Sequence, residues 1–187
     1  MNLLSIIQLV LFFLGTIFLF FTSNKSLRSF EVHGFYRFFV FEFTLMLVLL
    51  NIPYWFTNPF SLIQIISWIL LSISILLLGQ SIYFLAKYGG SRKRKNFSAN
   101  FEFENTISLV KEGVYKYIRH PMYGSLLFLA FGAMFKYISF FTAPLTVLIL
   151  FFLIFTAKIE EKENIKFFGF DYKEYMKKTK MFIPFVI

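Results

Sequence analysis

Residues able to bind a charged small molecule gather in two short strings in the second half of the sequence. The first, residues 109–124, holds an Arg-His pair before a proline, with a tyrosine on either side; the second begins with paired glutamates and continues through aromatic residues to residue 184. Aromatic faces attract cations, carboxylates accept hydrogen bonds from ammonium or hydroxyl groups, and cations hold carboxylates. The candidate site residues are Leu109, Val110, Tyr115, Arg119, His120, Pro121, Tyr123, Glu160 and Glu161.

The composition limits the surroundings in which this chemistry takes place. The chain contains no Cys, which excludes a disulfide, a thiolate nucleophile and a Cys-ligated metal site, and we expect no metal. Hydrophobic residues make up 58% of the 187 residues, against about 45–50% in soluble domains. The net charge of +9 falls in the gaps between apolar blocks, so we expect anionic lipid headgroups as partners and no nucleic acid.

Five apolar runs predict the elements that position the candidate residues. They cover residues 3–22, 35–52, 60–86, 121–135 and 140–157. The first is long enough, at about 30 Å, to cross one hydrocarbon core, and it lacks the basic start and cleavage site of a signal peptide. Pro121 should break the chain and begin a helix. Residues 106–119 are expected as a short amphipathic helix or turn, and 158–180 as an amphipathic helix interrupted or bent at Gly169.

The basic residues predict how the runs are oriented. If all five cross the membrane, 18 of the 19 Lys and Arg residues lie on one side and only Lys136 on the other. Cytoplasmic loops are enriched in these residues, so we expect a cytoplasmic C-terminus and an outside N-terminus. The basic run at residues 92–95 is expected to be an anchor on the same side.

The expected fold is therefore an all-α, multi-pass transmembrane bundle of about five spans with a cytoplasmic cofactor pocket. Residues 1–105 would form the N-terminal helices and a basic loop, and residues 106–187 the cofactor-binding region. The pocket would be built from residues 107–124 and 156–175. The oligomeric state is left open.

The order of the motifs resembles the C-terminal half of isoprenylcysteine carboxyl methyltransferases, part of a wider group that includes phospholipid methyltransferases. The resemblance covers residues 107–184 and rests on Leu-Val, Gly, Tyr and Arg-His-Pro-x-Tyr, followed by Glu-Glu, Phe-Gly-x-x-Tyr-x-x-Tyr and Pro. It implies a membrane enzyme that transfers a methyl group from S-adenosylmethionine to a lipophilic acceptor from the bilayer. The acceptor would be an isoprenylcysteine carboxylate or another lipid.

The resemblance also assigns roles to the candidate residues. Those that would contact the cofactor are Leu109, Val110, Tyr115, His120, Pro121, Tyr123, Glu160 and Glu161, and those with catalytic roles would be Arg119 and Glu160. One departure concerns the acceptor. Thr156 stands where the family has an arginine associated with the acceptor carboxylate, and Lys158 lies about 200° further round a helix. We therefore expect weak activity on prenylcysteine and a preference for another lipophilic nucleophile, such as an amine- or thiol-bearing lipid.

Other interpretations compete with this one. Membrane sterol reductases that use NADPH have a similar Arg-His-Pro-x-Tyr region, but Val114 and Tyr115 stand where they usually have Trp, and Met122 where they commonly have Asn. A non-catalytic scaffold or transporter would not need His120 and Glu160. Arg119 and His120 could instead meet headgroups, and the two glutamates could be ordinary residues at the start of a helix. Tyr117 is expected in an aromatic belt at the interface.

Two further polar residues lie outside the strings. Glu42 falls inside the second run, where a carboxylate marks either a polar contact or part of a substrate channel; Gln80 and Tyr83 are its possible partners. His33 is expected to be a solvated loop residue.

Overall fold

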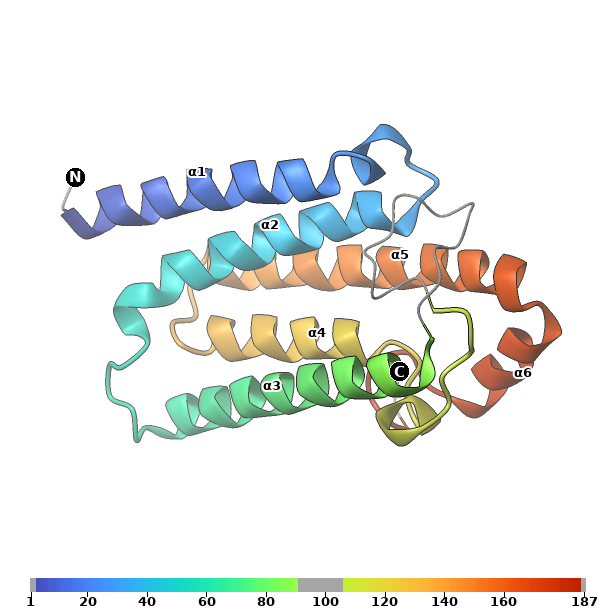
Figure 1. Cartoon of the computed structure of the whole chain (residues 1–187). Coiled ribbons are helices and arrows are strands. Elements are labelled where there is room, and N and C mark those ends of the chain that lie inside the picture. Colours follow the sequence, from blue (N-terminus) through green and yellow to red (C-terminus); the bar gives the residue numbers. More distant parts are fainter. Residues whose placement is uncertain (1–2, 91–105, 186–187) are drawn as a thin grey trace.

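The protein is a bundle of helices packed side by side (Figure 1). The structure is a computed structural model that describes residues 3–90 and 106–185. Within these ranges there are helices and no strand. The elements in chain order are α1 (Leu3–Ser23), η1 (Ser26–Arg28), α2 (His33–Asn51), η2 (Ile52–Tyr54), α3 (Leu62–Tyr88), η4 (Gly113–Lys116), α4 (Pro121–Met134), α5 (Thr142–Phe168) and α6 (Phe170–Lys178).

The apolar runs form helices, but not all of them have the expected length. Among the described residues, four helices are long and apolar enough to cross a membrane, and they make this a multi-pass membrane protein. The expected fourth span is the shorter helix α4, whose 14 residues extend about 21 Å. In Figure 1 it still carries the chain from the end of the bundle near α6 back to the opposite end.

The charged segment after residue 157 differs from the expectation. Its first part, residues 158–168, is not a separate helix, because α5 continues without a break from Thr142 to Phe168. Lys and Glu are good helix formers, so the change in hydropathy at Lys158 does not end the helix. The helix ends at Gly169, whose φ of 62° places it in the left-handed region, and α6 begins at Phe170, so the predicted interruption at Gly169 is confirmed.

The segment before α4 is mostly irregular. Of the two alternatives expected for residues 106–119, an amphipathic helix or a turn, the structure shows the turn, a short 3-10 helix at Gly113–Lys116. The predicted break at Pro121 is confirmed, because this residue begins α4 and His120 before it has a non-helical backbone. The basic run 92–95 lies outside the residues that the structure describes.

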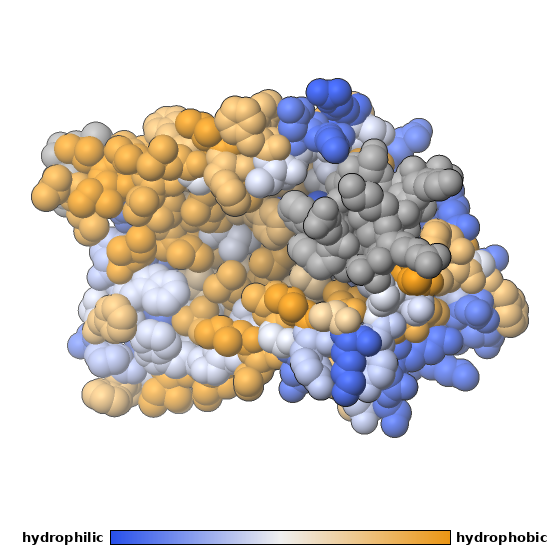
Figure 2. Space-filling model, in the orientation of Figure 1, coloured by the Kyte–Doolittle hydropathy of each residue, from blue (hydrophilic) through white to orange (hydrophobic). Residues whose placement is uncertain are grey.

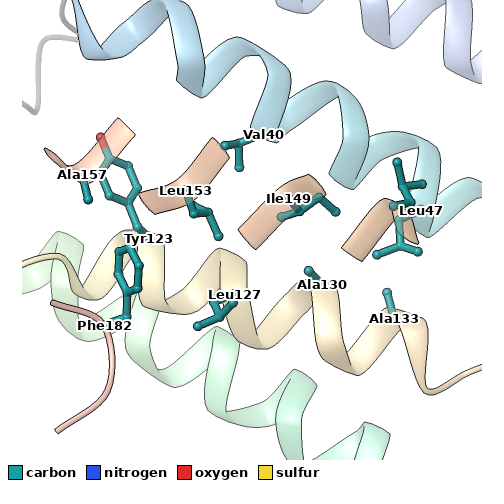
Figure 3. Close-up of a cluster of buried hydrophobic side chains, with 11 residues drawn as sticks. Val40, Leu47, Tyr123, Leu127, Ala130, Ala133, Ile149, Leu153, Ala157 and Phe182 are labelled. Atoms are coloured by element: carbon teal, nitrogen blue, oxygen red, sulfur yellow. The ribbon is translucent and has the colours of Figure 1, made fainter. Parts of the chain in front are cut away.

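Helix α4 lies in the middle of the bundle, where it contacts α2, α3 and α5. Ala130 and Ala133 are fully buried and face the apolar side chains of α2 and α5 (Figure 3). Small residues allow helix backbones to approach closely in a membrane. On the α3 side, Ser67 donates a 2.7 Å hydrogen bond to the carbonyl of Gly132, and Ser74 donates another to Ser125. These contacts hold the short helix against its longer neighbours.

The surface divides into an apolar belt and a charged end. Figure 2 shows hydrophobic residues covering much of the long helices, while hydrophilic residues gather at the end that carries α6. We call this the charged end. At the opposite end, the buried ammonium of Lys136 lies 3.3 Å from the centre of the Trp68 ring and donates to the side chain of Gln64. Burial lowers the pKa of Lys136.

Glu42 has a different partner from those expected. The hydroxyl of Thr16 on α1 donates a 2.9 Å hydrogen bond to its carboxylate, so its contact is with α1 and not with α3. Helix α1 packs along α2, and this bond joins the two helices in the apolar part of the bundle. Glu42 does not line the cavity described below.

The sidedness of the bundle remains a prediction, and cysteine labelling tests it. The chain has no Cys, so Thr57→Cys, between η2 and α3, and Lys178→Cys, at the end of α6, each give a single reactive thiol. We expect an impermeant maleimide to label residue 57 on intact cells and residue 178 only after permeabilisation. The reverse pattern would contradict the cytoplasmic assignment of the charged end.

Candidate active site

A cavity of about 300 Å³ opens within the charged end of the bundle. Its walls come from α2, α3, α4, α5, α6 and the segment before α4. The lining residues are Arg37, Phe41, Ser74, Leu78, Leu85, Thr106, Leu109, Val110, Tyr115, Arg119, His120, Pro121, Met122, Tyr123, Ser125, Leu126, Leu129, Glu160, Asn164, Phe168, Tyr172 and Tyr175. We distinguish a polar end, formed by α5, α6 and residues 109–120, from an apolar arm, formed by Phe41, Leu78, Met122, Leu126 and Leu129 between α2, α3 and α4.

The irregular segment before α4 forms one wall because of a single glycine. Gly113 has a φ of 60°, and a Cβ at this position would overlap the ring of Phe84 on α3. Only glycine combines this backbone conformation with such close packing. The turn that follows places the buried side chain of Tyr115 in the cavity wall, and the Tyr175 hydroxyl donates a 2.6 Å hydrogen bond to the Tyr115 carbonyl.

The segment after α6 holds the same wall from outside. Lys180 donates through its backbone N–H to Tyr117, and its carbonyl accepts from the Arg119 N–H at 2.9 Å. The N–H of His120 donates to the carbonyl of Met181 at 3.1 Å. We call residues 180–182 the clasp, because their backbone pairs with residues 117–120 and the side chain of Phe182 is fully buried behind them.

The two strings of candidate residues meet around His120. Its Nδ1 lies 3.7 Å from a carboxylate oxygen of Glu160, and its Nε2 lies 3.4 Å from one of Glu161. Arg119 donates through Nε to Glu161 and, at 2.6 Å, through Nη1 to the carbonyl of Thr179. One buried carboxylate therefore pairs with Arg119 and lies beside the His120 ring.

The structure places eight of the nine candidate residues on the cavity wall. These are Leu109, Val110, Tyr115, Arg119, His120, Pro121, Tyr123 and Glu160. Glu161 is not among the lining residues: it is buried behind the wall, where it contacts Arg119 and His120. Tyr117 is half exposed and outside this cavity. The functional roles of these residues remain predictions.

Three tyrosines of the wall, Tyr115, Tyr172 and Tyr175, remain in their protonated form. Burial raises the pKa of Tyr115 and Tyr172 well above the usual value, and the nearby negative charge of Glu160 raises it further. Burial also raises the pKa of Tyr175. The polar end therefore combines a carboxylate with neutral phenols that offer both aromatic faces and hydroxyl donors. No group of three or more His, Asp or Glu residues suited to a metal lies in the described part of the chain.

Sequence reasoning missed several residues of the cavity, and Asn164 and Arg37 are the polar ones that bear on its chemistry. Asn164 lies one turn after Glu160 on α5, and its amide nitrogen is 3.5 Å from the Glu160 carboxylate. The helical spacing of these two residues could have revealed it. Arg37 belongs to α2, which is far from both strings in the sequence. The only sequence feature that could have identified it was its charge at the start of an apolar run.

The expectation for His33 was wrong. It is the first residue of α2 and only 1% exposed. Its backbone N–H and its Nδ1 contact the two carboxylate oxygens of Glu163 at 3.0 and 2.7 Å, and its Nε2 lies 3.3 Å from Nη1 of Arg37. An ionised carboxylate only accepts, so Nδ1 carries the proton and Nε2 accepts from the arginine. We call Arg37, His33 and Glu163 the α2–α5 network.

The position of the family's arginine does not face the cavity. Thr156 is fully buried, and its hydroxyl donates a 2.7 Å hydrogen bond to the carbonyl of Phe152 in the preceding turn. It is not among the lining residues, and Lys158 is exposed. The cationic side chains on the cavity wall, among the residues that the structure describes, are those of Arg37 and Arg119.

Comparison with known proteins gives the family. The isoprenylcysteine carboxyl methyltransferase (ICMT) family matches residues 72–166, more than half of the chain. The chain belongs to this family. The matched segment begins within α3 and includes α4, the cavity wall before it and most of α5, so it contains both Arg119-His120 and Glu160-Glu161.

A curated relative and the solved structures complete the comparison. The chain is 34% identical over 88 residues to Protein-S-isoprenylcysteine O-methyltransferase of Saccharomyces cerevisiae. That stretch is 44% of this chain and 35% of the yeast protein, so the chain spans about a third of the length of this relative. No solved structure matches.

The Arg119–Glu161 pair yields a stability prediction. Both side chains are largely buried, and removing one charge of such a pair leaves the other without compensation, which typically costs about 3–5 kcal/mol. We expect Glu161→Gln to lower the free energy of unfolding by roughly 3 kcal/mol, measured in detergent micelles by titration with SDS. Glu174→Gln is the matched control, because the Glu174–Lys177 pair is exposed. Equal stability of the two variants would refute the structural role of Glu161.

Proposed function

We propose that this protein is an integral membrane methyltransferase that transfers a methyl group from S-adenosylmethionine to a lipophilic acceptor. One observation carries the proposal. The two strings of the family pattern lie about 40 residues apart in the sequence, and they meet on one cavity that is polar at the charged end and apolar between the membrane helices.

The chemistry of the polar end fits the cofactor. Its sulfonium is a cation, and Tyr115, Tyr123 and Tyr172 provide aromatic faces that attract cations. Its ammonium and ribose hydroxyls need an acceptor, which the partly exposed carboxylate of Glu160 offers. The cavity of about 300 Å³ is at the lower end of the range for small-molecule sites, about 300–1,000 Å³.

Positioning is the main contribution of the protein in this proposal. When bound, S-adenosylmethionine supplies an electrophilic methyl group: the acceptor atom bonds to its carbon as the carbon–sulfur bond breaks and sulfur keeps the electron pair. Glu160, near His120 and Asn164, binds the polar part of the cofactor. Glu161 keeps Arg119 and His120 in place behind the wall. Fixed orientation of two reactants removes a large entropic part of the barrier.

The apolar arm indicates the class of acceptor. Phe41, Leu78, Leu126 and Leu129 give it a hydrocarbon lining, and they belong to α2, α3 and α4 within the apolar part of the bundle. A lipid tail matches this lining, whereas a water-soluble acceptor would leave it exposed to water. An isoprenylcysteine carboxylate or a related lipid is therefore the proposed acceptor, reaching the cavity from the bilayer.

Cofactor binding is the direct test. We expect the purified protein to bind S-adenosylmethionine or its demethylated product in the micromolar range by isothermal titration in detergent. A hydrogen bond to a charged group contributes roughly 1.5–3 kcal/mol, so Glu160→Gln and His120→Ala should each weaken binding about tenfold or more.

Two controls make the result decisive. Glu112→Gln makes the same chemical change as Glu160→Gln at an exposed position outside the cavity, so it should retain wild-type affinity. A titration with NADPH tests the reductase interpretation. Binding of NADPH without binding of S-adenosylmethionine would overturn the proposal.

A further inference from the structure

A second cavity lies at the charged end, next to the one that holds the candidate active site. Its volume is about 440 Å³, and its walls are residues 176–181, 184 and 185, together with Tyr117 and Arg119. We call it the basic groove. Among the described residues, Arg119 alone lines both cavities, so the groove is a separate site on the other side of the strip where residues 117–120 pair with the clasp.

The groove carries an excess of positive charge. Lys177, Lys178 and Lys180 are all exposed on its walls. Glu174, the acidic residue that contacts this cluster, already forms a 2.6 Å ion pair with Lys177. In the part of the chain that the structure describes, the side chains of Lys178 and Lys180 make no hydrogen bond or ion pair. Two ammonium groups are therefore available to an anion.

Apolar side chains line the rest of the groove. Met176 and Met181 are half-buried, and Phe185 is 86% exposed beside the exposed Pro184. The half-exposed ring of Tyr117, which the sequence predicted for an aromatic belt, is also part of the wall. A small water-soluble anion would contact the lysines and leave these apolar groups in water. A ligand with an anionic head and a hydrocarbon part matches both.

The groove borders the apolar part of the bundle. Directly after Met181, the carbonyl oxygen of Phe182 lies against the first turn of α4, where a Cβ added to Gly124 would come within 3.0 Å of it. The same Cβ would lie 3.9 Å from the side chain of Leu77 on α3, one of the helices long enough to cross the membrane. Lysines and aromatic residues are enriched at this level of membrane proteins, where headgroups meet the hydrocarbon.

We propose that the basic groove binds the headgroup of an anionic phospholipid, with Lys178 and Lys180 on its phosphate and the start of its acyl chains against Met181 and Phe185. The net charge predicted anionic headgroups as partners in general, and the groove gives them one defined place. This lipid is a bound ligand and not the methyl acceptor, so the inference does not depend on the proposed function. Because the backbone of Lys180 pairs with Tyr117 and Arg119, the lipid would bind the strip that separates the two cavities.

A pair of lipids that differ in headgroup charge tests the proposal. The probes are phosphatidylglycerol and phosphatidylcholine with the same fluorescent acyl chain, titrated by anisotropy into the purified protein in a neutral detergent. We expect the wild-type protein to bind phosphatidylglycerol about tenfold or more tightly, since each lysine near an anionic headgroup contributes to the attraction. The double variant Lys178→Gln, Lys180→Gln should bind the two lipids equally.

A matched control separates this site from a general effect of charge. Lys162 and Lys166 are exposed on α5 and line neither cavity, so Lys162→Gln, Lys166→Gln removes the same charge and should keep the wild-type preference. An equal loss of preference in both double variants would assign the binding to diffuse attraction by the charged end and overturn the proposal.

Two further measurements complete the test. Glycerol phosphate, a soluble counterpart of the headgroup, should not displace the labelled lipid at concentrations that suffice for phosphatidylglycerol itself. Displacement by both at equal concentrations would show that the apolar wall takes no part, and it would overturn the assignment to a lipid. If the double variant does not fold, Lys178→Gln and Lys180→Gln decide singly: each should lower the preference severalfold, and an unchanged preference in both would contradict the proposal.

Discussion

The ion pair between Arg119 and Glu161 connects the two parts of the chain that form the cavity. Arg119 belongs to the irregular segment before α4, and Glu161 to the part of α5 beyond its apolar run. In surroundings with little water, each of these charges requires a partner, and here they satisfy one another. The same carboxylate lies beside His120, whose ring then reaches Glu160 on the cavity wall. This contact therefore joins the segment before α4 to α5 at the place where Arg119, His120 and Glu160 reach the cavity wall.

The unequal lengths of the helices provide the space that this pair surrounds. Helix α4 begins at Pro121, while α5 continues past that point towards α6 (Figure 1). The start of α4 and the continuation of α5 thus leave room that α6 and residues 109–120 partly enclose. Buried alanines and serine hydrogen bonds keep the short helix at a fixed depth among α2, α3 and α5.

Local patterns predicted most of the fold, and contacts between distant residues account for what they missed. The apolar runs and Pro121 predicted the helices of the bundle, because a helix and its break at a proline depend on residues close together in the sequence. The end of α5 was placed too early, since Lys158 and its neighbours change hydropathy without disfavouring a helix. His33 was taken for a loop residue because its partner, Glu163, lies 130 residues later in the sequence.

In the candidate site, too, the sequence pattern predicted some features, and others depend on the three-dimensional structure. The ordered motif identified Tyr115, His120 and Glu160 as neighbours, and the structure brings them to one cavity. It did not distinguish Glu160, which faces the cavity, from Glu161, which lies behind it, because adjacent residues on a helix differ only in direction.

The pairing of the clasp with residues 117–120 has a consequence for biosynthesis. The clasp follows α1 to α6 in the sequence, so during synthesis residues 117–120 lack these backbone hydrogen bonds until the described helices have left the ribosome.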